Sequence, residues 1–219
     1  MKDEQKIAAE LPEHKRILKM LRYEQQLWNR GRKYVGGIDE AGRGPLAGPV
    51  VAAAVVFPQS IFIPGVNDSK KLSPSKRETL YDLICEKAVA IGVGICDEKV
   101  IDKINILQAT YRAMKKAVAS LSIQPDHVLV DGRLISDFDL PQTSITGGDG
   151  KCFSIAAASI IAKVTRDRMM VEFDCLYPEY GFAQHKGYAT KKHVHAIIKH
   201  GFCQIHRISF KIKNLELYE

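Results

Sequence analysis

The chain has 219 residues, of which 46% are hydrophobic, and this size suits one main domain with a sizeable core and an appendage. It has no run of about 18 apolar residues, and residues 1–6 are too charged to lead into a signal peptide. We therefore expect a soluble, cytoplasmic protein with no membrane association. The five cysteines form no Cys-x-x-Cys pair, which argues against a disulfide framework or a zinc knuckle.

The charge is unevenly distributed along the chain. Lys and Arg outnumber Asp and Glu by 32 to 25, and the excess lies at the two ends. Residues 1–33 carry nine basic and five acidic side chains, residues 151–219 carry eleven and six, and the middle is slightly acidic. Basic flanks attract phosphate groups, and an acidic centre can hold a metal ion. The pattern favours an enzyme that acts on a polyanion, although a plain basic protein would share the net charge.

The predicted elements alternate between helices and strands. A charged amphipathic helix is expected at 13–28. Two apolar strands follow at 34–39 and 50–57, and the tight glycine-rich connection between them predicts an antiparallel pair. The later elements are predicted as a helix at 74–87 that begins after Ser73, a strand at 88–95, a helix at 106–121, strands at 127–131 and 142–146, a long helix at 152–174 and a helix at 190–200. Together they indicate an α/β protein with a mixed sheet.

Four carboxylates stand where predicted elements end. Asp39 and Glu40 close the first strand, Asp131 closes the strand at 127–131, and Asp149 sits in a glycine loop before the long helix. An acid beside glycine is usually a turn residue, but acids at several apolar strand ends can converge at one edge of a sheet. Adjacent carboxylates repel each other and resist burial unless they share a cation. The pattern therefore predicts a site for two Mg²⁺ ions, about 3.5–4 Å apart, that would act on a phosphodiester.

Six sequence blocks are shared with a known family. They are GIDEAGRGPL at 37–46, NDSKKLS at 67–73, VDG at 130–132, GD at 148–149, AASIIAKVTRD at 157–167 and YGFAQHKGY at 180–188. In this order they closely resemble bacterial ribonuclease HII, from about residue 34 to 210. The resemblance implies a ribonuclease H-like mixed five-stranded sheet flanked by helices, with a small helical C-terminal part. We expect an N-terminal helical extension at 1–33, a catalytic core at 34–175 and a substrate-binding part at 176–219.

The resemblance also implies an activity. Members cleave the RNA strand of RNA/DNA hybrids and cut on the 5′ side of single ribonucleotides embedded in duplex DNA, leaving a 3′-hydroxyl and a 5′-phosphate with Mg²⁺ or Mn²⁺. Carried over by position, the metal-binding catalytic acids are Asp39, Glu40, Asp131 and Asp149. The implied substrate contacts are the turn Gly42, Arg43 and Gly44 to the 2′-hydroxyl, with the arginine on a phosphate, and Tyr188 to the sugar. Lys70, Lys71 and Lys186 are expected to contact phosphates. A sliding clamp is a candidate partner, and we expect a monomer.

Several residues keep a second interpretation. Arg166 and Asp167 are predicted to form a structural ion pair that orders the long helix. Zinc is not predicted, because no Asp or Cys stands at zinc-like spacing from the histidines at 185, 193, 195, 200 and 206. The block at 206–211 departs from the family pattern at Ile208 and Lys211, which leaves a duplex contact there open. The N-terminal helix either covers a sheet edge or adds duplex contacts.

Rival functions fit the residues less well. A dinucleotide-binding loop is disfavoured because its third glycine is misplaced at Gly48 and the neighbouring acids would repel a pyrophosphate. A Walker loop would need glycine where Ile145 stands and Ser or Thr in place of Cys152. Ribonuclease HIII shares the first two acids but has a longer N-terminal DNA-binding domain and Glu as its fourth acid. A non-catalytic nucleic-acid binder would not need Asp131 or Asp149.

Overall fold

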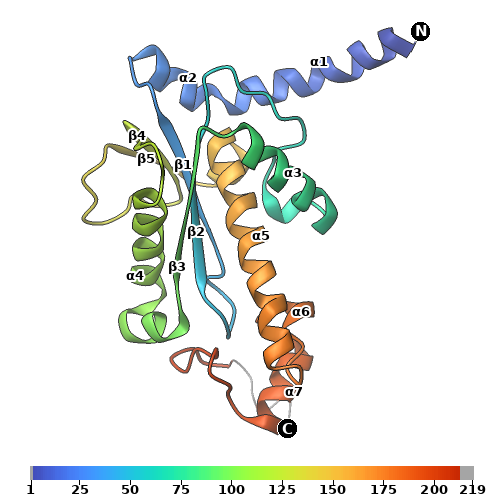
Figure 1. Cartoon of the computed structure of the whole chain (residues 1–219), viewed down its shortest axis with the longest axis vertical. Coiled ribbons are helices and arrows are strands. Elements are labelled where there is room, and N and C mark those ends of the chain that lie inside the picture. The colour runs from blue at the N-terminus through green and yellow to red at the C-terminus, as the bar shows by residue number, and fades with distance from the viewer. Residues whose placement is uncertain (1, 213–219) are drawn as a thin grey trace.

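The centre of the protein is one five-stranded sheet of order β3-β2-β1-β4-β5 (Figure 1). The computed structural model describes residues 2–212, with side chains described from residue 11 onward. The strands are β1 (Val35–Ala41), β2 (Val50–Val56), β3 (Ala90–Cys96), β4 (His127–Asp131) and β5 (Gln142–Ile145). The β1–β2 and β2–β3 pairs are antiparallel, whereas β1–β4 and β4–β5 are parallel. The prediction of a mixed sheet with an antiparallel first pair is confirmed.

Helices cover both faces of this sheet (Figure 1). The longer helices are α1 (Lys2–Met20), α2 (Arg22–Asn29), α3 (Pro74–Lys87), α4 (Glu98–Ala119), α5 (Phe153–Leu176) and α7 (Lys191–His200). Short helical turns are η1 (Ser69–Lys71), η2 (Gly148–Gly150) and α6 (Phe182–His185). One face packs against α4 and the other against α5. Among residues 2–212, we find no helix with the length and apolar character needed to cross a membrane.

Strand β2 shows why both faces need a helix. Every residue of β2 is buried, because alternate side chains of a strand reach opposite faces. Ala53 and Val55 join the cluster beneath α5, whereas Ala52 and Ala54 join the cluster beneath α4. The apolar strand predicted at 50–57 is therefore confirmed as β2, and it is buried on both faces.

Helix α5 lies close against β1. A Cβ atom added to Gly37 of β1 would stand 2.1 Å from the carbonyl carbon of Ser154 in the first turn of α5. The alanines at 156, 157 and 158 are fully buried and leave little bulk along the same contact. This close packing fixes the start of α5 relative to the end of β1, where the predicted acids lie.

Two predicted helices differ from the observed ones. The helix expected at 13–28 is divided at Leu21 into α1 and α2. The helix expected at 106–121 is only the second part of α4, which is broken at Asn105 (φ 66°, ψ 164°). The side-chain oxygen of Asn105 accepts hydrogen bonds from two amides of the following turn. Asn105 thus acts as an internal N-cap, and hydrophobic periodicity located only the part that follows it.

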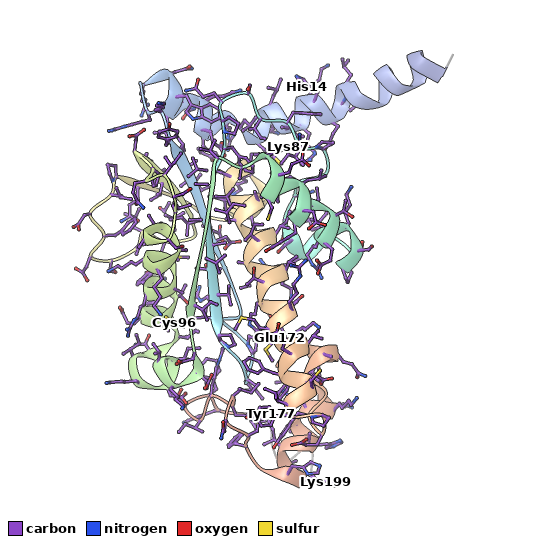
Figure 2. The ribbon with its side chains drawn as sticks, viewed as in Figure 1. His14, Lys87, Cys96, Glu172, Tyr177 and Lys199 are labelled. Atoms are coloured by element: carbon purple, nitrogen blue, oxygen red, sulfur yellow. The ribbon has the colours of Figure 1, made fainter. Side chains whose placement is uncertain are left out.

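The N-terminal helices pack on the core at one end of the molecule. Leu27 of α2 packs with Val35, Leu129 and Ile145, which belong to β1, β4 and β5. Helix α2 therefore covers a part of the sheet, as one of the two interpretations of this segment proposed. In Figure 2, His14 of α1 lies at the end of the molecule opposite to Tyr177 and Lys199, which mark the C-terminal helices.

Candidate active site

Three of the four predicted acids line one cavity. β1 and β4 are parallel, so their carboxyl ends meet at the same edge, and the pairing of Ile38 with Val130 places Asp39 beside Asp131. Asp39, Glu40 and Asp131 line a cavity of about 200 Å³. The sequence prediction that distant strand-end acids come together is confirmed for these three.

Asp149 joins the group through its neighbours. The turn η2 follows β5, and the amide of Gly148 donates to Asp131 Oδ1 at 2.6 Å. Asp149 is 8% exposed and accepts a hydrogen bond at 3.0 Å from Nζ of Lys70, which lines the acid cavity. Lys70 thus bridges the fourth acid to the cavity of the other three.

Asp39 and Glu40 turn to opposite sides of β1. Asp39 lies 3% exposed on the α5 side, where it interacts with Ser159. Glu40 lies on the α4 side, and its Oε1 is 3.4 Å from Nη1 of Arg43. Glu40 and Arg43 also line a second cavity of about 390 Å³ next to α4. Asp39 therefore borders only the acid cavity, whereas Glu40 borders both cavities, and their opposite orientations follow from the period of two in a strand.

The acids destabilise one another's charged forms. Burial first, and then the charges of Glu40 and Asp131, raise the pKa of Asp39 well above its ordinary value. Burial also raises the pKa of Asp131, with a further contribution from Asp149. The pKa of Glu40 is raised by burial although Arg43 opposes the change. Carboxylates held this close in a low dielectric are stabilised by an added cation.

The four acids offer ligands that suit a hard divalent cation, although their carboxylate groups do not converge on a single position. In the part of the chain with described side chains, no group of three or more His, Cys, Asp or Glu residues is arranged to hold a metal ion. The ammonium group of Lys70 stands at Asp149, where it supplies positive charge. Because all four acids offer only oxygen ligands, their chemistry fits Mg²⁺ or Mn²⁺. A cation bound between them would replace Lys70, whose side chain is 76% exposed and has room to move.

The turn at 42–44, here called the GRG turn, lies at the same cavity. Gly42 has φ +95°, and a Cβ atom there would stand 2.1 Å from Nε of Arg166, so both the backbone conformation and the space require glycine. A Cβ atom on Gly44 would be 3.7 Å from Cε1 of Tyr188. The GRG turn and Tyr188 therefore lie next to each other at the acid cavity, which both of them line.

The three predicted lysines are dispersed. Lys70 lines the acid cavity, whereas Lys71 is exposed and does not line it. Lys186 donates to the carbonyl of Ala183 at 2.6 Å and lines a neighbouring groove of about 490 Å³. That groove shares Tyr188 with the acid cavity, so Lys186 lies one groove away from the acids.

The prediction that Arg166 pairs with Asp167 is wrong. The expected ion pair between Arg166 and Asp167 is not formed, because successive helical residues point in different directions. Asp167 instead accepts from Nζ of Lys163 at 2.7 Å. Arg166 is fully buried and donates to the carbonyls of Pro49, Lys186 and Ala47 at 2.9–3.0 Å. It remains a scaffold residue, but the segments that it joins carry the predicted substrate contacts.

Further residues line or support the site although the sequence analysis did not name them as site residues. Ser159 and Lys163 of α5 line the acid cavity. Buried Arg207 donates to carbonyls of the GRG turn and of the residues that follow it. Ser159 and Lys163 stand at positions i and i+4 of α5, so they lie on the same face of the helix, and this spacing could have indicated both of them. Nothing in the pattern around Arg207 predicts contacts with a turn that lies so far away in the sequence.

The fold and the site define a nuclease of the ribonuclease H-like class. A ribonuclease H2 from Pyrococcus horikoshii OT3 shares this fold with a TM-score of 0.67 and 29% identity, over 84% of this chain and 96% of that one. A ribonuclease HII from Archaeoglobus fulgidus, solved in a complex with PCNA, has a TM-score of 0.65 and 26% identity, over 83% and 96% of the two chains.

The family is shown by sequence. The family model described as Ribonuclease HII matches residues 36–213. The Ribonuclease HII of Acetivibrio thermocellus is 58% identical over 195 residues, which are 89% of this chain and 76% of that protein. The chain belongs to the ribonuclease HII family. It is therefore an endonuclease, a hydrolase with ribonuclease H activity on RNA/DNA, and the predicted family, fold class and enzyme class are confirmed.

Proposed function

We propose that this enzyme cleaves the RNA strand of RNA/DNA hybrids and also cuts on the 5′ side of single ribonucleotides embedded in duplex DNA, leaving a 3′-hydroxyl and a 5′-phosphate. One observation carries the proposal: the GRG turn and the ring of Tyr188 lie next to each other at the cavity that Asp39, Glu40 and Asp131 line. A sugar that contacts both the turn and the ring would have its phosphate near the acids. The 2′-hydroxyl is the group that separates RNA from DNA at such a position.

The four acids would hold two divalent cations, Mg²⁺ or Mn²⁺. When bound, these cations supply the positive charge that stabilises the attacking water and the leaving 3′-oxygen of a phosphodiester. Asp39, Glu40, Asp131 and Asp149 are the ligands, and their mutual repulsion favours cation binding. Lys70, released from Asp149, would contact a substrate phosphate.

The remaining predicted contacts position the duplex. Backbone groups of Gly42 and Gly44 can approach the ribose closely because neither residue carries a Cβ atom. Arg43 is exposed and lies at the junction of two cavities, where its guanidinium can reach a phosphate. Lys71 and Lys186 would contact phosphates farther along the duplex.

A sliding clamp is proposed as a partner of a monomeric enzyme. The Archaeoglobus relative was solved in a complex with PCNA, and this is the support for the proposal. Size-exclusion chromatography with light scattering, with and without a purified bacterial clamp, tests both parts. A stable dimer, or no co-elution at micromolar concentrations, would contradict them.

Cleavage of a duplex with one ribonucleotide tests the proposed activity. We expect wild-type enzyme with Mg²⁺ to make one cut on the 5′ side of the ribonucleotide, and to leave the all-DNA duplex intact. Asp39→Asn should lose more activity than the roughly 10–100-fold that follows loss of an outer-shell metal partner. Asp139→Asn, which changes an exposed acid outside the cavity, is the matched control. Cutting by Asp39→Asn at the wild-type rate, or cutting in excess chelator, would refute the proposal.

A further inference from the structure

Three segments meet behind the opening of the acid cavity, which Gly44 and Tyr188 both line. The loop at 42–48 lies between the turn at 185–188 and the segment at 205–207. Hydrogen bonds of 2.8 Å run from the Leu46 amide to the Gly187 carbonyl, from the Gly48 amide to the Ile205 carbonyl, and from the Arg207 amide to the Leu46 carbonyl. The segment at 205–207 is therefore joined by its backbone to the loop that begins with the GRG turn.

Arg207 holds the GRG turn by its carbonyl groups. Its guanidinium donates to the carbonyls of Gly42 (2.6 Å), Arg43 (3.1 Å), Pro45 (2.8 Å) and Gly48 (2.6 and 2.8 Å). The side chain is 1% exposed, and all of these acceptors are backbone carbonyls. Among the residues whose side chains the structure describes, this buried guanidinium donates to carbonyls of one loop and to no carboxylate. It fixes the path of that loop.

His206, the preceding residue, reaches Tyr188 through a second histidine. Its Nδ1 accepts from the Cys203 amide at 2.9 Å, so its proton lies on Nε2. That Nε2 is 3.0 Å from Nε2 of His193, which must then accept, so His193 carries its proton on Nδ1. His193 Nδ1 donates to the Tyr188 carbonyl at 2.9 Å. The tautomers follow from the hydrogen-bond network, and the chain of donors ends at Tyr188.

The two side chains thus act on the two walls of one opening. We propose that His206 and Arg207 form a positioning pair that sets the distance between the GRG turn and Tyr188, and that this distance governs cleavage at a ribonucleotide. The inference rests on the proposed function, in which the GRG turn and Tyr188 hold the ribose. Neither His206 nor Arg207 touches substrate, because both are buried behind the opening.

The anchoring of the pair supports a positioning role. Asp102 of α4 accepts from the amides of Ile208 and Ser209 at 3.1 and 3.0 Å, so the residues that follow the pair are fixed to the core. The guanidinium of Arg207 also lies 5.0 Å from the ring centre of Phe210. A rigid segment can hold both walls at once, and a shift of about 1 Å at such a site can lower the rate by roughly 100-fold.

Two substitutions of His206 separate positioning from mere packing. A Gln side chain can place an amide N–H near the former Nε2 and donate to His193, whereas Asn is too short to do so. We expect His206→Asn and Arg207→Lys to lower kcat/KM on a duplex with one ribonucleotide by about tenfold. His206→Gln should retain most of the activity. His200→Asn, on the exposed end of α7, is the control, and circular dichroism at the assay temperature checks that each variant is folded.

A double-mutant cycle with Tyr188→Ala completes the test. If His206 acts through Tyr188, His206→Asn should have little further effect on kcat/KM once the ring is removed. Equal losses in His206→Gln and His206→Asn, or a His206→Asn loss that persists in full beside Tyr188→Ala, would overturn the proposal.

Amide hydrogen exchange tests the positioning role of His206 and Arg207 without measuring enzyme activity. The Leu46 amide bonds to Gly187 and the Tyr188 amide to His185, so both report on the walls of the opening. We expect faster exchange of both amides in Arg207→Lys, and of Tyr188 in His206→Asn but not in His206→Gln. Unchanged exchange would overturn the pair even if the enzyme is active. If the wild type fails to cut at a ribonucleotide, the proposed function fails, and the exchange data still show whether the pair sets the opening.

Discussion

We expect Glu24→Ala to lower the free energy of unfolding by about 2–4 kcal/mol. Glu24 is 1% exposed, and its Oε1 accepts from the Ser154 amide (2.8 Å), the Ser154 hydroxyl (2.7 Å) and the Cys152 thiol (3.1 Å). Loss of this cap of α5 costs about 1 kcal/mol. The buried hydroxyl left without an acceptor costs a further 1–3 kcal/mol or so. For a chain of this length the melting temperature should fall by about 5–15 °C.

Glu24→Gln is the matched variant, and it adds a dependence on pH. Burial above all raises the pKa of Glu24 above its ordinary 4.5, although its three donors oppose the change. The folded state therefore holds the proton more tightly than the unfolded state does. This contribution to stability is complete below pH 4.5 and is lost as the pH rises through the folded-state pKa. Gln keeps an acceptor and does not titrate, so its stability relative to wild type should improve as the pH rises.

Urea unfolding followed by circular dichroism, at about pH 5 and about pH 8, measures both effects. Gln26→Ala, an exposed change on the same helix, is the control. Glu24 does not cap α5 as described if Glu24→Ala is as stable as the control, or if Glu24→Gln is destabilised as much as Glu24→Ala at both pH values.

Three further outcomes are expected. Burial above all lowers the pKa of His193 and of His206 from 6.5 to about 4. The contribution of these neutral histidines to stability is therefore present above pH 6.5 and is lost as the pH falls towards 4. The urea midpoint of unfolding should drop across this pH range, and it should drop less in His206→Gln. A flat profile would contradict the buried neutral pair. Gly37→Ala should lower the free energy of unfolding by about 3 kcal/mol or more, because the new Cβ atom would lie 2.1 Å from the Ser154 carbonyl carbon. A melting temperature near that of wild type would show that α5 can move away. Asn105→Gly should be more stable than Asn105→Ala by about 1 kcal/mol, because φ 66° with ψ 164° favours glycine and neither variant keeps the side-chain cap. If Asn105→Ala is the more stable variant, the backbone at this position is not strained.

The layout of the sheet and the acids could be predicted because their signals are local. An apolar run without charge, as in β2, must be covered on both faces, and an acid that ends such a run is held at a sheet edge. Asp39 and Asp131 followed from this reasoning. The parallel pairing of β1 with β4, which brings them together, depends on the crossover between the strands and is visible only in the structure.

The residues that sequence reasoning missed act at long range through polar groups. Arg207 and the Gly42 carbonyl are 165 positions apart, and Glu24 and the Ser154 amide are 130 apart. Hydrophobic periodicity contains no information on such pairs, because backbone carbonyls and amides are present at every position. Arg166 was placed correctly in the scaffold, but its acceptors are carbonyls rather than the carboxylate of the next residue.

The position of Arg207 has a consequence for synthesis of the chain. Two of its acceptors, the carbonyls of Gly42 and Gly48, are made 165 and 159 residues before the guanidinium that satisfies them. A nascent polypeptide can assemble the sheet and α5 on the ribosome while the carbonyls of the GRG turn still lack this donor. Chains that stop before residue 207 would therefore fold around an unfinished substrate opening, because the carbonyls of the GRG turn would lack the guanidinium that holds them.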